Sequence, residues 1–424
     1  MSTLLNKISS KENLADAWKK LNKVNKSSYG IDEVTIEDFQ GNLDDKLSSI
    51  SKKLKDGKYK FSPTRAFVIP KSNGKRRPLQ IPIISDRLVL KAIAIELDKQ
   101  FKETIEKSKG VSFAYQKQLG VKDAVFKIKE HYNNGNNFVL EADLIDFFGT
   151  VDKNKLLTNQ ILPNIPDRSL DHLIQSALNQ KIAGLEDLKP MDQELFKNLE
   201  HGIPQGNPLS PLFSNIYLSP FDFHLIDKGL KLVRYADDFV IMCKSREECE
   251  KAFFECEKTL AKLDLKIHSL KEAKKTKIIE LKNESLDFLS ITFDGKNLYP
   301  SLKNVKRFKD RIRVISSGKI EHDVLTLLTK VSRTLDGWLS AFYYTKVEKY
   351  DKEIDYFINR QILRTLEKYD WKFTSNVKGK LPPKYRRIGQ SADCLSAKQR
   401  KKSGIPNCSD LLKQKRAKIA HKPQ

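Results

Sequence analysis

The sequence predicts an α+β fold, and two observations indicate it. Short runs rich in β-branched and aromatic residues flank turn residues at 65–82 and 232–242, as in β-hairpins. Longer segments at 1–60 and 300–370 carry apolar residues at helical spacing. With 424 residues, of which 39% are hydrophobic and 31% charged, the chain is long enough for two or three globular domains.

Composition excludes several classes of protein. No apolar run approaches the roughly 20 residues that span a bilayer, so we expect no membrane partner. The N-terminus lacks a secretory signal, and Glu12 and Asp16 argue against a transit peptide. The five cysteines show no zinc spacing, which favours a reduced, cytoplasmic protein. A net charge of +24 predicts a polyanionic partner, and nucleic acid is the first candidate.

The N-terminal 60 residues are predicted to be helical, with an interruption at 29–39. Gly30 supplies a turn there. Thr35 and Asp38 have the spacing of a helix capping box. A hairpin with a basic tip follows at 65–82, and an apolar helix at 86–101 is expected to belong to the core.

The hairpin tip has two interpretations. Its cationic side chains are those of Lys71, Lys75, Arg76 and Arg77. They could be a solvated charged turn. They could instead grip a triphosphate, because the arginine fork matches phosphate oxygens.

The segment 138–148 leads apolar residues into Asp143 at a predicted strand end. A sheet presents catalytic carboxylates at such a position. Asp146 competes for that role. Because it lies three residues after Asp143, we expect its side chain to point elsewhere or to cap the next turn. Phe148 fits core packing when it is considered alone.

Residues 151–200 are predicted to be mainly helical, and 201–218 to be a Gly/Pro-rich loop that runs into a helix. Gly206 would allow the backbone to approach a ligand closely. An ordinary loop-to-helix junction is the alternative interpretation.

The hairpin at 232–242 carries Asp237 and Asp238 at its tip. Two adjacent acids are good turn formers, but like charges held together also favour a divalent cation. Hard carboxylate oxygens suit Mg²⁺. Asp143 supplies the third carboxylate that the metal interpretation requires.

The C-terminal half begins with an amphipathic helix at 247–263, whose Cys249 and Cys256 we expect to pack. A basic turn at 271–277 and one strand at 286–293 follow. Residues 300–370 are predicted to be all-helical. Their aromatic residues are more typical of a core than of a base-stacking surface, and they are Trp338, Phe342, Tyr343 and Tyr344.

From residue 371 onward, Lys and Arg greatly outnumber Asp and Glu. Such a segment can be a solvated basic tail. Its apolar residues suggest that part of it packs, and they are Cys394, Leu395, Ile405, Leu411 and Leu412.

The order of these motifs resembles the reverse transcriptases, over roughly residues 25–370. Tyr235-Ala236-Asp237-Asp238 is the most specific of them. The resemblance implies a right-hand polymerase of fingers, palm and helical thumb with a basic C-terminal extension. The implied domains are an N-terminal helical extension (1–60), fingers (61–137 with part of 151–200), palm (138–299), thumb (300–370) and an RNA-binding extension (371–424).

The resemblance also implies chemistry and site residues. Asp143, Asp237 and Asp238 would be catalytic, with two Mg²⁺ ions (Mn²⁺ as a substitute) and dNTP substrates. The implied metal-holding set is Asp143, Leu144, Asp237 and Asp238. The implied nucleotide contacts are Lys71, Arg77, Phe148, Gln205, Gly206 and Lys275. Phe148 falls on the family's sugar gate, and either Lys271 or Lys275 would be the general acid.

Nucleic-acid contacts are expected on the thumb and the extension. The predicted residues are Lys303, Lys306, Arg307, Arg311, Arg313, Arg386, Arg387, Lys398, Arg400 and Lys401. One departure from the family is Ser290, which stands where the primer-grip strand usually has glycine.

The segments 30–32 and 335–339 resemble the group II intron lineage, and the chain is similar to bacterial defence-associated reverse transcriptases. The resemblance implies copying of a neighbouring non-coding RNA into cDNA in defence against phage. Two alternatives stay open, namely a maturase-like protein that assists intron splicing and a template-independent or RNA-making polymerase. The oligomeric state does not follow from the sequence.

Overall fold

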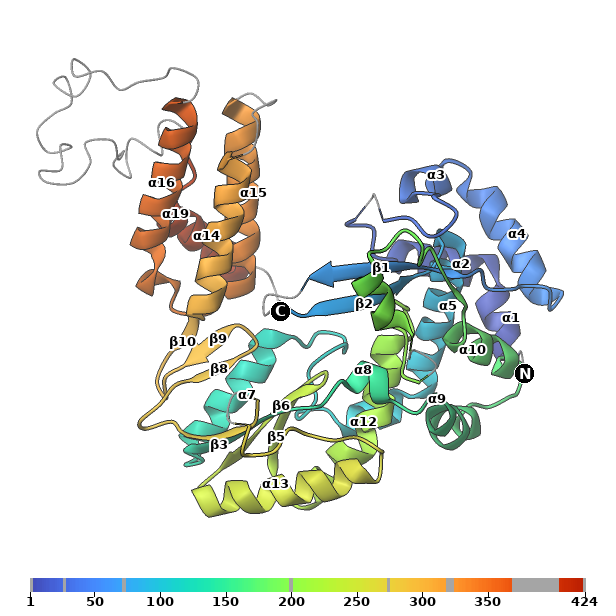
Figure 1. Cartoon of the computed structure of the whole chain (residues 1–424), viewed down its shortest axis with the longest axis horizontal. Helices are drawn as coiled ribbons and strands as arrows, with labels where there is room; N and C mark the ends of the chain where they lie inside the picture. The colour runs from blue at the N-terminus through green and yellow to red at the C-terminus, as the bar shows by residue number, and fades with distance from the viewer. Residues whose placement is uncertain are drawn as a thin grey trace, which may run out of the picture. The chain divides into compact units, whose positions relative to one another are not determined.

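A computed structural model of the chain describes residues 3–25, 28–70, 74–197, 201–272, 275–317, 324–367 and 404–421. It has a mixed α+β architecture, as the sequence predicts (Figure 1). The chain divides into two compact units, residues 1–280 and 281–424. In the described part of the chain, no helix is both long and apolar enough to cross a membrane.

The first unit combines helices with two small sheets. Its helices are α1 (Leu4–Ser9), α2 (Lys11–Lys20), α3 (Ile36–Gly41), α4 (Leu43–Lys55), α5 (Ile84–Gln100), α6 (Lys102–Lys107), α7 (Val121–Asn133), α8 (Phe147–Thr150), α9 (Lys153–Lys155), η1 (Leu156–Ile161), η2 (Leu162–Asn164), α10 (Asp171–Leu178), α11 (Pro190–Gln193), η3 (Glu194–Phe196), α12 (Ser210–Asp227) and α13 (Arg246–Ala261). Its strands are β1 (Thr64–Pro70), β2 (Arg76–Ile81), β3 (Phe138–Asp143), β4 (Ile182–Ala183), β5 (Lys231–Tyr235), β6 (Asp238–Cys243) and β7 (Lys277–Glu280).

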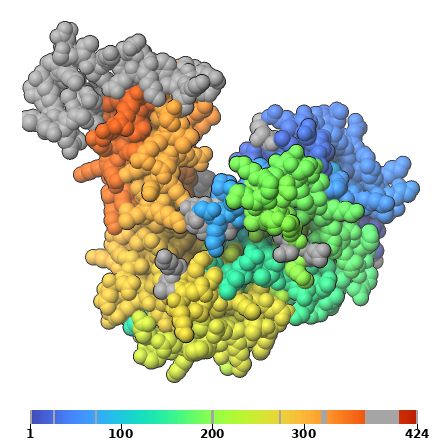
Figure 2. All heavy atoms as spheres, in the orientation of Figure 1, coloured from blue at the N-terminus to red at the C-terminus, as the bar shows by residue number. Residues whose placement is uncertain are grey.

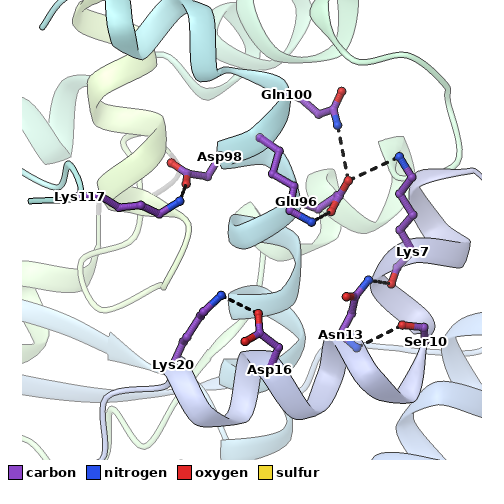
Figure 3. A network of polar contacts seen from close by, with 10 residues as sticks. Lys7, Ser10, Asn13, Asp16, Lys20, Glu96, Asp98, Gln100 and Lys117 are labelled. Atoms are coloured by element: carbon purple, nitrogen blue, oxygen red, sulfur yellow. Dashed lines mark hydrogen bonds and ion pairs between the residues drawn. The ribbon is translucent and has the colours of Figure 1, made fainter.

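The N-terminal helices are part of the first unit's core. Thr35 and Asp38 form the predicted capping box at the start of α3. The buried carboxylate of Glu96 on α5 pairs with Lys99 and with Lys7 of α1, which ties the first helix to the centre of the unit (Figure 3). Because Glu96 is 4% exposed, these cations offset the cost of burying its charge.

The central sheet has the order β5-β6-β3-β7, and its neighbouring strands are antiparallel. Helices α7 and α13 pack on this sheet (Figure 1). Val139 and Leu140 of β3 and Val240 and Ile241 of β6 are all fully buried, so both faces of the central strands are covered. Strands buried in this way have a fixed register, because a one-residue slip would exchange their two faces.

A second sheet has the order β2-β1-β4. Strands β1 and β2 form the predicted hairpin, with Phe67 opposite Leu79. The prediction that 151–200 is mainly helical missed β4, which pairs in parallel with the start of β1. This strand is two residues long, so it leaves no alternating pattern in the sequence.

The second unit begins with three short strands, β8 (Leu286–Phe288), β9 (Ile291–Phe293) and β10 (Leu298–Pro300). The expectation of one strand over 286–293 is wrong. Leu289 and Ser290 have φ angles of 52° and 69°, so the chain reverses between β8 and β9. Ser290, for which the resemblance stated above implies a glycine position, therefore has a left-handed backbone conformation that glycine adopts without steric cost.

In the described part of the second unit, helices follow these strands, as predicted for 300–370. They are α14 (Leu302–Ser317), α15 (Val324–Phe342), η4 (Val347–Lys349), α16 (Asp351–Glu367) and α19 (Cys408–Ala420). Trp338 and Phe342 are buried, and the Trp338 ring contacts the rings of both Phe308 and Phe342. These aromatic residues therefore belong to the core.

Helix α19 packs against α15 and α16 within this unit. Leu412 is 2% exposed, and Arg416 donates hydrogen bonds to the carbonyl oxygens of Tyr343 and Thr345. Part of the basic C-terminal segment therefore packs, as its apolar residues predict.

Candidate active site

Two of the three predicted catalytic carboxylates lie on neighbouring strands of the central sheet. Asp143 ends β3 and Asp238 begins β6, and the two are direct cross-strand partners. Directly opposite residues project on the same face of an antiparallel pair. The third acid, Asp237, occupies the two-residue turn between β5 and β6.

The sequence determines this placement through register. The pairing of β3 with β6 begins at Phe138 opposite Cys243 and ends at Asp143 opposite Asp238. The apolar residues between these pairs are buried, so the acids are left at one end of the strands. Leu144 follows directly, is 4% exposed and forms a bridge with Ile267.

Electrostatic effects at this end of the sheet are strong. Asp238 is an exposed residue, but partial desolvation of its carboxyl group, together with the negative charges of Asp237 and Asp143, raises its pKa to about 7. The ammonium group of Lys275 forms an ion pair with the Asp143 carboxylate. This hydrogen bond raises the pKa of Lys275 above its ordinary value.

The carboxylate groups of Asp143, Asp237 and Asp238 are suitable ligands for a divalent cation. Carboxylate oxygens are the preferred ligands of Mg²⁺, and the negative charges of Asp237 and Asp143 add to the effect of desolvation on the pKa of Asp238. The Lys275 ammonium already acts as a cation beside Asp143. Among the described residues, no three His, Cys, Asp or Glu side chains are gathered into a ready-made metal site.

Several predicted nucleotide contacts line one cavity of about 190 Å³ within the first unit. Arg77 comes from β2, Phe148 from α8, and Gln205 from the loop before α12. Gly206 is next to Gln205 and is exposed. Residues predicted from separate motifs are therefore brought together around one hollow.

Main-chain hydrogen bonds build this cavity. The Gln80 N–H donates to the Gln205 carbonyl oxygen at 2.8 Å, and the Ile203 N–H donates to that of Phe148 at 2.9 Å. Gly202 and Gly206 have φ angles of 83° and 109°. A Cβ atom on Gly202 would lie 2.2 Å from the Phe148 carbonyl oxygen, so only glycine fits this close approach.

The sequence did not indicate the positions of two residues in this region, His201 and Asp192, and it left that of Asp146 open. Asp146 and His201 line the same cavity, and Asp192 forms an ion pair with Arg76. Asp146 has a left-handed φ of 43°, and its side chain makes no cap hydrogen bond to the helix that follows. Of the two alternatives expected for this residue, capping the next turn is therefore excluded. In the space-filling view, the blue hairpin β1–β2 lies beside the green segment α11–η3 that carries this ion pair (Figure 2).

The sequence signal for Asp192 was the acidic character of 184–200. Because of these acids we expect the segment not to lie along phosphates, but they did not indicate that one of them would pair with the basic hairpin. For His201 no sequence signal was specific.

Phe148 is partly buried and makes an edge-on contact with the buried Phe147, with ring centroids 5.3 Å apart. It therefore both packs and faces the cavity. Of the two lysines proposed as general acid, Lys275 contacts Asp143, whereas Lys271 is exposed. Lys71 lies outside the described residues.

The predicted nucleic-acid contacts on α14 are all exposed, and they are Lys303, Lys306, Arg307, Arg311 and Arg313. Arg313 also stacks over Phe357 and pairs with Asp310. The remaining predicted contacts lie outside the described residues, and they are Arg386, Arg387, Lys398, Arg400 and Lys401.

Known proteins provide an independent comparison. Escherichia coli Protein YkfC is 28% identical over 292 residues, which is 58% of this chain and 74% of YkfC. Group II intron-encoded protein LtrA of Lactococcus lactis subsp. cremoris is 32% identical over 209 residues, 49% of this chain and 32% of LtrA. A solved structure, "Partial Cas6-RT-Cas1--Cas2 complex", aligns over 65% of this chain and 43% of its own, with 28% identity and a TM-score of 0.36.

A family model described as "Reverse transcriptase (RNA-dependent DNA polymerase)" matches residues 69–293, more than half of the chain. The matched residues include most of the β1–β2 hairpin, the three acids Asp143, Asp237 and Asp238, and the β8–β9 hairpin. The chain therefore belongs to the reverse transcriptase family.

Proposed function

We propose that this protein is an RNA-directed DNA polymerase whose chemistry takes place at Asp143, Asp237 and Asp238. The observation that carries the proposal is the cross-strand pairing of Asp143 with Asp238, next to the turn that holds Asp237. Two Mg²⁺ ions held by these acids would activate the primer 3′-hydroxyl and stabilise the leaving pyrophosphate. The Leu144 main chain adjoins this set.

The chain's own residues would bind and orient the incoming nucleotide. Arg77 carries a guanidinium group at the cavity and suits the triphosphate. Phe148 would place its ring under the sugar, while Gln205 and Gly206 present main chain to the nucleotide. Lys275, already protonated beside Asp143, is the group best placed to donate a proton to pyrophosphate.

The decisive variant is Asp237→Asn, which removes one carboxylate charge and keeps the side-chain size. We expect Mg²⁺-dependent incorporation of dNTPs on an RNA template to fall by more than about 10³-fold, with thermal unfolding unchanged. Asp44→Asn is the matched control, because Asp44 lies on the exposed face of α4. Undiminished incorporation in Asp237→Asn would contradict the proposal.

The preference for DNA synthesis has its own test at Phe148. If its ring excludes a 2′-hydroxyl, Phe148→Ala raises the kcat/KM for rNTPs relative to dNTPs by about tenfold or more, since a steric clash is removed. Phe147→Leu is the control, because Phe147 is buried next to it and is absent from the cavity lining. Equal loss of both activities would assign Phe148 to core packing alone.

We further propose that the template is a non-coding RNA encoded near the gene and that its cDNA serves defence against phage. The net charge of +24 and the exposed basic face of α14 support binding of a structured RNA. Sequencing of the nucleic acids that co-purify with the protein should recover one dominant RNA and its complement. Protection against phage should disappear in Asp237→Asn.

A maturase-like function is the second candidate, and the similarity to the intron-encoded LtrA favours it. It would require RNA binding and not polymerisation. Intron splicing that persists in Asp237→Asn would support this function, whereas loss of both phage protection and cDNA would support the first.

A further inference from the structure

We propose that Arg234 is a positioning residue that fixes the turn carrying Asp237. The inference rests on the proposed polymerase function. It assigns a role to a buried side chain that does not itself contact the metal ions or the nucleotide. Arg234 is the last but one residue of β5, and its side chain is completely buried. A fully buried guanidinium is uncommon and requires compensation for its lost hydration.

Asp222 of α12 supplies the compensating charge. Its carboxylate is also completely buried, and it accepts from Arg234 through both oxygens: Nε donates to Oδ1 at 2.7 Å, and Nη2 pairs with Oδ2. This two-pronged arrangement matches the flat guanidinium and holds it in a single orientation. The ion pair thereby fastens β5 to α12.

The remaining guanidinium nitrogen points to the catalytic turn. Nη1 of Arg234 donates to the carbonyl oxygen of Ala236 at 2.9 Å and to Oδ1 of Asn215 at 3.2 Å. Ala236 has a left-handed φ of 59°, which costs a residue with a side chain about 1 kcal/mol or more. The peptide held by this bond is the one that joins Ala236 to Asp237.

The same set of residues also holds the neighbouring segment 111–114. The Arg234 N–H donates to the Val111 carbonyl oxygen at 2.7 Å, and the Phe113 N–H donates to that of Arg234 at 2.9 Å. Asn215 donates from Nδ2 to the Ala114 carbonyl oxygen at 2.9 Å. The turn is therefore held from α12 and from this segment together.

Stability alone does not explain a buried ion pair at this position. Well-packed apolar residues of similar volume are often equally stabilising or better, because they carry no desolvation cost. Such residues could not donate a hydrogen bond to the Ala236 carbonyl. The geometry therefore points to orientation of the Asp237 peptide as the role that requires arginine.

A double variant separates orientation from folding. Arg234→Met with Asp222→Leu removes both charges and keeps the volume, so we expect the protein to remain folded with undiminished denaturant resistance. We expect kcat for dNTP incorporation to fall about 100-fold, as for a misplacement near 1 Å, while the KM for dNTP and the affinity for RNA stay within about threefold. Leu232→Ala is the control, since it opens a cavity in the same strand and leaves the bond to Ala236 in place.

A conservative variant covers the case in which the double variant does not fold. Arg234→Lys keeps the buried charge, but one ammonium cannot make both the two-pronged contact and the bond to Ala236. We expect this variant to fold, to bind RNA normally and to lose most of its kcat. Hydrogen–deuterium exchange of the peptide 235–239, and Mn²⁺ binding followed by electron paramagnetic resonance, should both report a looser turn without any turnover.

The outcomes distinguish the two proposals. No Mg²⁺-dependent incorporation in the parent protein would overturn the polymerase proposal, and the exchange measurement would still test the turn. An active parent whose Arg234→Lys and double variants keep full kcat and unchanged exchange at 235–239 would overturn the role of Arg234. Equal losses in these variants and in Leu232→Ala would likewise assign Arg234 to general stability.

Discussion

The hairpins β5–β6 and β8–β9 both contain a two-residue turn with a strained backbone, but different hydrogen bonds stabilise the two turns. Each reverses direction over two residues, and each places a residue with a side chain at positive φ, Ala236 in the first and both Leu289 and Ser290 in the second. The first turn is held by the buried guanidinium of Arg234. In the second, the Ser290 carbonyl oxygen accepts from the Ser301 N–H at 2.9 Å.

The difference shows where precision is required. In the β8–β9 turn, a main-chain hydrogen bond holds the strained residue Ser290. The turn that presents Asp237 has in addition a charged pair buried in the core of the first unit, although burying charge is expensive. Backbone strain that the surroundings hold firmly in place is typical of functional sites.

The largest effect is expected from breaking the charged pair on one side only. Arg234→Ala leaves the Asp222 carboxylate buried without its cation, so the free energy of unfolding of the first unit should fall by about 3–5 kcal/mol. Urea unfolding followed by circular dichroism measures the change. Leu289→Ala in the other turn should cost less than about 1 kcal/mol, and comparable losses in the two turns would remove the contrast.

Asp86 is a buried carboxylate whose partners are neutral, in contrast to Asp222, which is paired with Arg234. The dependence of stability on pH therefore tests what the cation contributes. Asp86 is 1% exposed, and its partners are the neutral donors Tyr59, Ser62 and Gln180. Burial raises the pKa of Asp86 to about 6 from an ordinary value of 3.8. Its contribution to stability is therefore complete below pH 3.8 and is lost as the pH rises through about 6.

The variant Asp86→Asn tests this sign, because it removes the ionisation. Between pH 4 and pH 8, the free energy of unfolding of the parent should fall by ~2.5 kcal/mol relative to that of the variant. Denaturant melts of both proteins across this range provide the measurement. A difference that is flat or that grows with pH would show that the buried carboxyl group behaves as an ordinary acid.

The smallest effect comes from glycine in each turn. Ser290→Gly relieves a φ of 69° at the cost of a more flexible unfolded chain, so thermal unfolding should change by less than about 1 kcal/mol in the stabilising direction. Ala236→Gly keeps the carbonyl that Arg234 holds, and polymerase activity should stay within about threefold. A large loss of activity in Ala236→Gly would mean that the strained residue itself, and not its hydrogen bond, orients Asp237.

Local patterns predicted the elements that carry the site. The apolar runs around Asp143 and Asp237 specified strands and register, and Thr35 with Asp38 specified a helix start. These signals are short-range, and burial of one strand face enforces them. The strand ends could therefore be placed from the sequence alone.

Long-range partners could not be predicted in the same way. Nothing in the sequence links Arg234 to Asp222, or Arg76 to Asp192, because these pairs form only when distant segments pack. The β8–β9 turn was missed for a different reason. Leu289 is not a typical turn residue, a single serine is a weak turn signal, and the left-handed conformation of both residues leaves no mark in the sequence.

Helix α19 has a consequence for how the second unit is made. Its contacts with α15 and α16 are completed by residues 408–420, far along the chain from Glu367. Until that stretch has left the ribosome, the carbonyl groups of Tyr343 and Thr345 and the apolar site of Leu412 lack their partners. Translation that stops between these points would leave a helical bundle with one open side, which is a natural target for proteases and chaperones.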